Sequence, residues 1–135
     1  MKTWTADSSA SPRAAWALVS RPAAWPAWAP HMRGFWSSPP LGDGEVVSGA
    51  WGAAAVLGVV PVPVLVTGKE PGRSWTWQFG LTRITHRVEP RPGGCRLAVD
   101  LEAPWPLETM LTATWGPVFA LSLRRLARVA AQRTS

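Results

Sequence analysis

The sequence predicts an α+β fold in which a bent antiparallel sheet wraps around a long C-terminal helix, with two short helices after the first strand. Residues 106–132 show helical periodicity, and their first half is nearly free of charge. Three segments before this helix, 74–81, 82–89 and 95–101, alternate apolar and polar residues as half-buried strands do. A one-sided sheet and an apolar helix must bury their hydrophobic surfaces, and wrapping the sheet around the helix satisfies both.

The composition is that of one folded domain over residues 1–135. Hydrophobic residues make up 47% of the chain and charged residues only 16%, which argues against global disorder. Ten tryptophans supply large apolar surfaces, which suit a big core or the wall of an apolar pocket. Cys95 is the only cysteine, so neither an intramolecular disulfide nor a thiol metal cluster can form within the chain.

The net charge of +6 and the pI of about 11.3 raise the question of nucleic-acid binding. The arginines are scattered, however, except for a group at the end of the predicted C-terminal helix: Arg124, Arg125, Arg128 and Arg133. Basic residues there complement the negative end of the helix dipole, so we interpret the group as a solvated helix end. We therefore expect no nucleic-acid partner.

Residues 46–67 carry no charge and are long enough to cross a bilayer as a helix. The many β-branched valines argue against a helix, and so do five helix-breaking residues: Gly49, Gly52, Gly58, Pro61 and Pro63. We therefore interpret the segment as strands and expect no membrane span. The N-terminal residues lack the continuous apolar region of a signal peptide, which predicts a cytoplasmic protein.

The first third of the chain predicts a strand, a helix and a shorter helical turn. Residues 2–8 alternate weakly, as a short strand does. Ser11 suits the N-cap of a following helix and Pro12 its first turn, because a proline there loses no hydrogen bond. The pair Arg21-Pro22 ends this helix, and the prolines within 23–30 limit the next piece to one short helical turn. His31 follows in a predicted loop, where we expect it to be solvated.

The middle of the chain predicts strands separated by turns. In order, the sequence suggests a strand at 32–37, a turn at 39–44, a long strand at 45–57 bent at its glycines, a turn at 58–61 and a strand at 62–69. Pro71 and Gly72 then occupy the centre of a type II hairpin turn over residues 70–73.

Alternation assigns faces to the last three predicted strands. Trp75, Trp77 and Phe79 share one face of 74–81. In 82–89 the apolar face holds Ile84, His86 and Val88, and in 95–101 it holds Cys95, Leu97, Val99 and Leu101. Residues 90–94 form the turn between these two strands. Asp100 and Glu102 lie on the opposite, outer face, where we expect solvated carboxylates and no tuned acid/base couple.

The C-terminal helix is predicted from Pro106, at the first helical position, to about Gln132. Residues at three- and four-residue steps share one face of this helix, and they are Leu107, Leu111, Trp115, Val118, Ser122, Leu126 and Val129. Between Leu107 and Leu123 only Glu108 is charged, so we expect the first half of the helix to be enclosed.

Several stretches resemble the SRPBCC superfamily, also called START-like, which includes polyketide cyclases and dehydrases. The matching stretches are Trp16-Ala17-Leu18-Val19, Trp25-Pro26-Ala27-Trp28-Ala29-Pro30, the segment 70–77, His86-Arg87-Val88-Glu89-Pro90, the segment 93–97 and the closing helix. They cover most of the chain in order, and they are landmarks of fold without a catalytic signature. The resemblance implies a helix-grip fold with a deep cavity between sheet and helix for an apolar or aromatic small molecule.

The residues that should face this cavity are mostly aromatic or apolar. From the sheet we expect Trp51, Trp75, Trp77, Phe79, Ile84, His86 and Val88, and from the helix Met110, Leu111, Thr114, Trp115 and Val118. His86 is the candidate catalytic residue, because a histidine in an apolar wall can polarise a carbonyl or move a proton. The alternative is that these residues are core packing, and we favour core packing for any single one of them, because aromatic residues on a sheet face usually pack in the core.

Other chemistries find little support in the sequence. Two histidines and one cysteine far apart give no zinc pattern, no glycine-rich phosphate loop follows a strand, and no GxSxG elbow is present. We expect no metal and no cofactor. Two functions stay open for the same pocket: a cyclase- or dehydratase-like enzyme of bacterial secondary metabolism, and a non-catalytic lipid or metabolite carrier. Nucleic-acid binding through the basic helix end is a third interpretation, which the scattered arginines disfavour. The oligomeric state, a homodimer included, is also open.

Overall fold

The chain passes through short helices and seven described strands before it ends in one long helix. The computed structural model describes residues 1–29, 32–38, 44–56 and 60–134. The elements are β1 (Lys2–Ser8), α1 (Pro12–Ser20), the 3₁₀ helix η1 (Pro22–Ala27), β2 (Met32–Ser38), β3 (Trp51–Val56), β4 (Val60–Glu70), β5 (Ser74–Phe79), β6 (Thr82–Arg91), β7 (Gly94–Glu102) and α2 (Leu107–Thr134). His31, residues 39–43 of the first predicted turn and residues 58–59 of the second lie outside the described residues. The second turn is wrong at Val60 and Pro61, which belong to β4.

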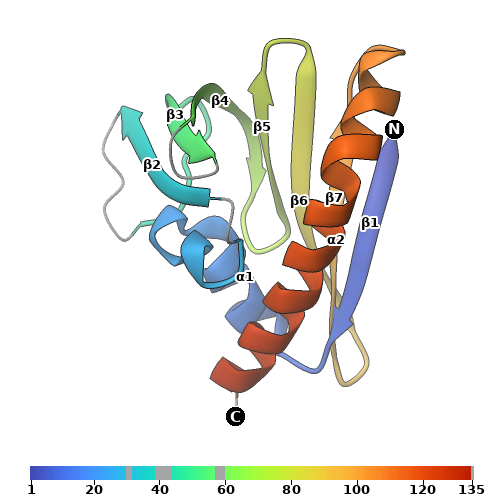
Figure 1. Ribbon diagram of the computed structural model, residues 1–135. Helices are drawn as coiled ribbons and strands as arrows, with labels where there is room; N and C mark the ends of the chain where they lie inside the picture. Colours follow the sequence, from blue (N-terminus) through green and yellow to red (C-terminus); the bar gives the residue numbers. More distant parts are fainter. Residues whose placement is uncertain (30–31, 39–43, 57–59, 135) are drawn as a thin grey trace.

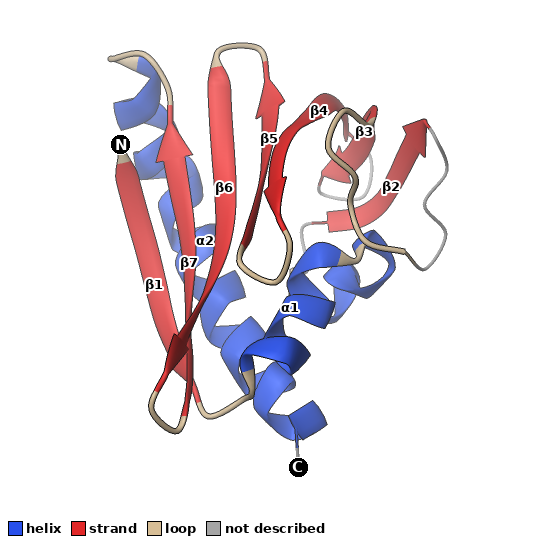
Figure 2. Ribbon diagram, turned by 180° about the vertical axis from the view of Figure 1, so that it is seen from behind, coloured by secondary structure: helices blue, strands red, loops and turns tan. Residues whose placement is uncertain are grey.

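Within the described residues, the strands form one antiparallel sheet in the order β1-β7-β6-β5-β4-β3-β2. Figure 1 shows α2 running across one face of this sheet. In Figure 2, which views the molecule from the opposite side, β6 and β7 lie in front of α2. The far strands curl toward the short helices, where η1 packs against β2. The predicted α+β fold, a bent sheet that grips a long helix, is confirmed.

The start of α1 follows from its first two residues. Ser11 is the N-cap, and its hydroxyl oxygen accepts a hydrogen bond from the backbone N–H of Ala14 at 3.2 Å. Pro12 occupies the first turn, where its missing N–H leaves no partner unsatisfied. Both features confirm the prediction for this helix.

The end of α1 is held by tryptophan side chains from other elements. The last carbonyls of a helix have no partner within it. The indole N–H groups of Trp25 and Trp75 both donate to the carbonyl of Val19, at 2.9 and 3.0 Å. The indole of Trp28 donates to the carbonyl of Leu18 at 3.0 Å. These bonds fix η1 and β5 against α1. They also direct the three indole rings into the region between the sheet and α2.

The long strand predicted from Glu45 to Leu57 is wrong in its first half, because β3 begins at Trp51. The residues before it are fastened by tertiary bonds. Val46 is buried, and its N–H donates to the carbonyl of Ser20 at 2.8 Å. Gly49 adopts a φ of 90°, which turns the chain out of the extended conformation that a strand requires.

Glu45 fixes the same connecting segment through its side chain. Its carboxylate accepts a bond from the indole of Trp16 at 2.9 Å and pairs with Lys69 at 3.2 Å. Burial alone would raise the pKa of Glu45, but the hydrogen bonds from Trp16 and Lys69 and the charges of Lys69 and Arg21 bring the pKa below its usual value. Glu45 is therefore ionised at neutral pH and ties α1 to β4.

The C-terminal helix extends two residues beyond its predicted end, and its first half is not enclosed as predicted. The side chains of Met110 and Leu121 are 58% and 53% exposed. A helix that is apolar nearly all round indicates burial, but this one packs on β1 and β7 through one side. No helix in the described part of the chain is long and apolar enough to cross a membrane.

Close packing between β1 and α2 depends on a small residue. A Cβ at Gly116 would lie 3.1 Å from the indole of Trp4, so glycine lets this ring approach the helix. Trp4 also contacts Phe119 with ring centroids 5.2 Å apart. This contact positions Phe119 at the edge of the space between sheet and helix.

Candidate functional site

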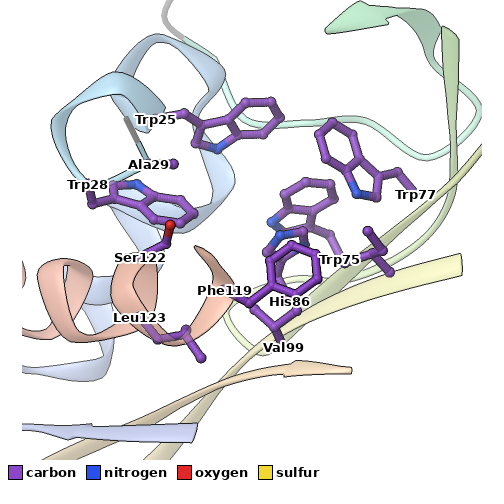
Figure 3. A pocket seen from close by; sticks show the side chains of 11 residues that line it. Trp25, Trp28, Ala29, Trp75, Trp77, His86, Val99, Phe119, Ser122 and Leu123 are labelled. Carbon is purple, nitrogen blue, oxygen red and sulfur yellow. The ribbon is translucent and has the colours of Figure 1, made fainter. Parts of the chain in front are cut away.

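A small pocket lies between the concave face of the sheet and α2 (Figure 3). Its wall consists of Trp25, Trp28 and Ala29 from η1 and the residues after it, Trp75 and Trp77 from β5, Ile84 and His86 from β6, Val99 from β7, and Phe119, Ser122 and Leu123 from α2. The cavity volume is about 40 Å³. That volume exceeds the roughly 10–15 Å³ that one water needs and is far below the roughly 300–1,000 Å³ of pockets for drug-sized ligands.

Four rings form most of this wall. Trp75 and His86 are direct partners across β5 and β6, and their rings stack with centroids 4.2 Å apart at 12°. Trp25 is stacked with Trp75 at 5.3 Å and 8°. Trp77 stands edge-on to the other three rings, at 5.2 to 5.9 Å. Stacked and edge-on arrangements are the favoured geometries of aromatic pairs, so these contacts stabilise the cluster beyond the burial of its apolar area.

The wall holds few polar groups. The indole N–H groups of Trp25, Trp28 and Trp75 are already bonded to α1. His86 and Ser122 also contribute polar atoms, and among the described residues no Asp, Glu, Lys or Arg lines the pocket. Such a wall can bind apolar surface and orient it with one or two hydrogen bonds.

The described residues offer neither a metal site nor a reactive thiol. No group of three or more His, Cys, Asp or Glu side chains among them could hold a metal ion. Cys95 lies buried in the core, where burial and, to a lesser extent, the charge of Asp7 raise the pKa of its thiol. The thiol therefore stays neutral and weakly nucleophilic at physiological pH.

The predicted cavity residues fall into three groups. Trp75, Trp77, Ile84 and His86 line the pocket. Five others do not line it: Val88 is buried in the core, Phe79 and Leu111 are half-buried and pack against the core, and Trp115 and Val118 are half-buried. Trp51, Met110 and Thr114 are exposed, and their predicted inward placement is wrong.

The exposed positions have simple geometric causes. Trp51 pairs with Leu65 across β3 and β4, and both side chains point to the outer face, with exposures of 63% and 44%. Met110 and Thr114 are one turn apart on the side of α2 that faces away from the sheet, and the hydroxyl of Thr114 donates to the carbonyl of Met110 at 2.9 Å. Neither side chain can reach the pocket.

Sequence reasoning missed several lining residues. Trp25 and Trp28 are landmarks of the fold in the resemblance and have no predicted site role, although their three-residue spacing in a short helix puts both rings on one side. Ser122 belongs to the predicted inner face of the C-terminal helix, but no feature of the sequence predicts a role for its hydroxyl group. Phe119 carried no periodic signal of its own, because the whole first half of that helix is apolar.

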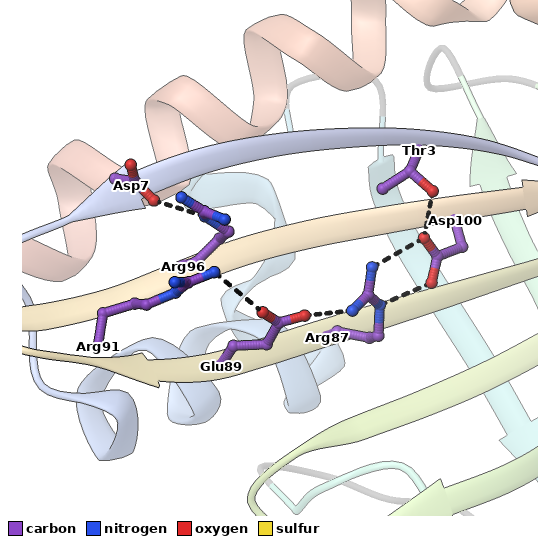
Figure 4. A network of polar contacts seen from close by, with 7 residues as sticks. All are labelled: Thr3, Asp7, Arg87, Glu89, Arg91, Arg96 and Asp100. Atoms are coloured by element: carbon purple, nitrogen blue, oxygen red, sulfur yellow. Dashed lines mark hydrogen bonds and ion pairs between the residues drawn. The ribbon is translucent and has the colours of Figure 1, made fainter.

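The outer face of the sheet carries an ion-pair network (Figure 4). Asp100 accepts two hydrogen bonds from Arg87, at 2.6 and 3.0 Å, and one from the hydroxyl of Thr3 at 2.7 Å. Arg87 also pairs with Glu89. The outer position predicted for Asp100 is correct, but its side chain is only 12% exposed, so the expectation of a freely solvated carboxylate is wrong. The network braces β1, β6 and β7 on the face opposite the pocket.

The arginine group at the end of α2 is partly structural. Arg125 is half-buried, and its guanidinium donates to the carbonyl of Ala27 at 3.2 Å. Arg124 and Arg128 are exposed. Arg125 therefore joins α2 to η1, while its neighbours face solvent as predicted.

A bent sheet closed over a long helix, with an aromatic pocket between them, defines a helix-grip protein. Residues 3–131 match the family of polyketide cyclases/dehydrases and lipid transport proteins, and the chain belongs to this family. The resemblance noted in the sequence is thereby confirmed. No curated protein matches the chain.

Solved structures confirm the fold. Protein MLL2253 from Mesorhizobium loti superposes with a TM-score of 0.76 over 99% of both chains at 14% identity. A protein from Thermobifida fusca gives a TM-score of 0.75 at 17% identity, covering 98% of this chain and 95% of its own. A Rhodobacter sphaeroides protein gives 0.68 at 21% identity, covering 96% and 90%. At these identities the likeness concerns the fold alone.

Proposed function

We propose that this chain binds a small, flat, apolar or aromatic molecule in the pocket between the sheet and α2. The observation that carries the proposal is the wall of stacked and edge-on rings with no Asp, Glu, Lys or Arg among its described residues. Flat rings bind flat ligands by stacking, and an ionised ligand would lose its hydration without compensation. The membership in a family named for cyclases and lipid transport supports a ligand of this kind.

The volume of the pocket limits the ligand. About 40 Å³ holds water or the edge of a ring, so a complete ring must push lining side chains aside. Native mass spectrometry of gently purified protein, followed by denaturing extraction, would detect a co-purified molecule. A bound aromatic compound or lipid would support the proposal and name its class.

Toluene should change the fluorescence of the pocket tryptophans, excited at about 295 nm, in a saturable manner. In Trp77→Phe this change should shrink and the affinity should fall a few-fold, because Trp77 is 7% exposed and forms the edge-on side of the wall. Trp51→Phe is the matched control, since its ring lies outside the pocket and is 63% exposed. Equal changes in both variants, or no saturable change in the wild type, would contradict binding at this pocket.

A second candidate function is polyketide cyclase- or dehydratase-like catalysis, and the position of His86 favours it. Its ring is in the pocket wall, stacked on Trp75, so a bound carbonyl would lie beside an imidazole that can donate or accept a proton. A cyclase of this kind would bend a reactive chain inside an apolar wall. A carrier with the same pocket would release its ligand unchanged.

His86→Ala should slow any cyclisation or dehydration by about 10²–10⁴-fold, the range that one positioned acid/base group contributes. The assay follows a synthetic 1,3,5-triketone by ultraviolet absorbance as it forms an aromatic product. His86→Gln, which keeps a polar side chain of similar reach but no proton transfer, serves as the comparison. An unchanged rate in His86→Ala would contradict a catalytic role for His86. If the wild type shows no turnover, catalysis is contradicted and only the binding function stands.

A further inference from the structure

The pocket contains a buried hydroxyl group that no described residue satisfies. Ser122 is only 4% exposed, and its Oγ is buried and has no hydrogen-bond partner among the described residues. Figure 3 shows this side chain pointing from α2 into the pocket beside Trp28. Burying a hydroxyl without a partner opposes folding, so such a group in a pocket wall calls for an explanation.

Other helical hydroxyl groups in this chain behave differently. Ser20 donates to the carbonyl of Trp16 at 2.7 Å, and Thr112 donates to that of Glu108 at 2.7 Å, each four residues earlier. This bond is the usual way in which a serine or threonine inside a helix satisfies its hydroxyl. Ser122 instead directs its oxygen into the pocket.

We propose that Ser122 Oγ anchors the ligand by a hydrogen bond to one neutral oxygen, a hydroxyl or a carbonyl, on the edge of a flat ring. This inference rests on the proposed function and deepens it by naming the ligand class as phenol-like or aryl-ketone-like. The indole donors of Trp25, Trp28 and Trp75 are engaged with α1, which leaves them unavailable to that oxygen. A hydroxyl both donates and accepts, so Ser122 can bind either kind of oxygen.

Phenol and toluene test this role, because they have nearly the same shape and differ by one hydroxyl. Both are titrated into wild type and Ser122→Ala, with tryptophan fluorescence as the readout. The ratio of phenol to toluene affinity should fall about 3- to 10-fold in Ser122→Ala, as expected for one neutral hydrogen bond. Ser20→Ala, the same change at a buried helical serine outside the pocket, should leave the ratio unchanged.

Thermal unfolding of the ligand-free variants gives an independent readout. Ser122→Ala should raise Tm by about 2–5 °C, because it removes a buried group without a partner, whereas Ser20→Ala should lower Tm through loss of its bond to Trp16. An unchanged affinity ratio with a lowered Tm in Ser122→Ala would assign Ser122 a structural role and overturn this inference alone. Failure of both probes to bind the wild type would overturn the proposed function as well.

Discussion

Replacing Trp75 with alanine should lower the free energy of unfolding by about 3–5 kcal/mol, the range measured for deletion of a large buried aromatic side chain. Small domains are stable by only about 5–15 kcal/mol, so this loss would leave a substantial unfolded population under mild denaturing conditions. It is the largest effect that we expect from any single side chain in the pocket wall.

The reason is that Trp75 joins three parts of the fold. Its ring is 1% exposed, stacked against both His86 and Trp25, and met edge-on by Trp77. Its indole N–H donates to the carbonyl of Val19 and thereby links β5 to the end of α1. Trp25 donates to the same carbonyl, so the variant leaves no orphaned acceptor, and the loss comes from packing and from the cavity.

Guanidinium denaturation followed by far-ultraviolet circular dichroism measures this effect. Trp75→Phe keeps a stacked ring and should lose about half as much or less, because the cavity is smaller. Trp51→Ala is the surface control, and at 63% exposure it should change stability by less than about 0.5 kcal/mol. A cost of Trp75→Ala no greater than that of Trp51→Ala would contradict the central position given to this ring.

The parts of the fold that follow from local chemistry could be predicted from the sequence. The inner face of β5 and β6 follows from alternation, and the turn at 70–73 follows from Pro71 and Gly72, whose φ is 78°. The cap at Ser11 likewise needs only its neighbours along the chain. These features depend on interactions between residues close together in the sequence, so they can be predicted without knowledge of the tertiary contacts.

Features fixed by distant contacts could not be predicted. The segment before β3 has the valines of a strand, but the bond from Val46 to Ser20 and the turn at Gly49 give it another path. The face on which Trp51 lies depends on its pairing with Leu65 of β4, whose side chain is also exposed, and this pairing cannot be read from the residues of β3 alone. Which residues line the pocket depends on how η1 packs against the sheet, because Trp25 and Trp28 occupy part of the space in which the resemblance implies a deep cavity.

Replacing Gly94 with alanine should destabilise the protein by about 3 kcal/mol or more, through backbone displacement and without loss of any side chain. A Cβ at this position would lie 2.0 Å from the carbonyl oxygen of Ser8 and 3.0 Å from the Cα of Ser9. Both are backbone atoms at the end of β1, which cannot rotate away as a flexible side chain can. The strand pair β1–β7 must therefore separate locally.

The same displacement would weaken the contact of β1 with α2. The hydroxyl of Ser8 donates to the carbonyl of Ala127 at 2.7 Å, so moving Ser8 pulls at this helix as well. Gly93→Ala is the matched control one residue earlier, where φ is 79° but nothing lies within 4 Å of the added atom. Its cost should be limited to the roughly 1–2 kcal/mol of an L-residue in the left-handed region.

Denaturation of the two variants, together with amide hydrogen exchange over residues 2–8, separates the two causes. Gly94→Ala should speed exchange along β1, because its bonds to β7 are disturbed at the point where the register begins, with Ser8 opposite Cys95. Gly93→Ala strains only the turn and should leave this exchange unchanged. If Gly94→Ala and Gly93→Ala lose the same stability and exchange in β1 is unchanged in both, the close backbone approach at Gly94 is contradicted. The conformation of the turn alone would then explain the two adjacent glycines.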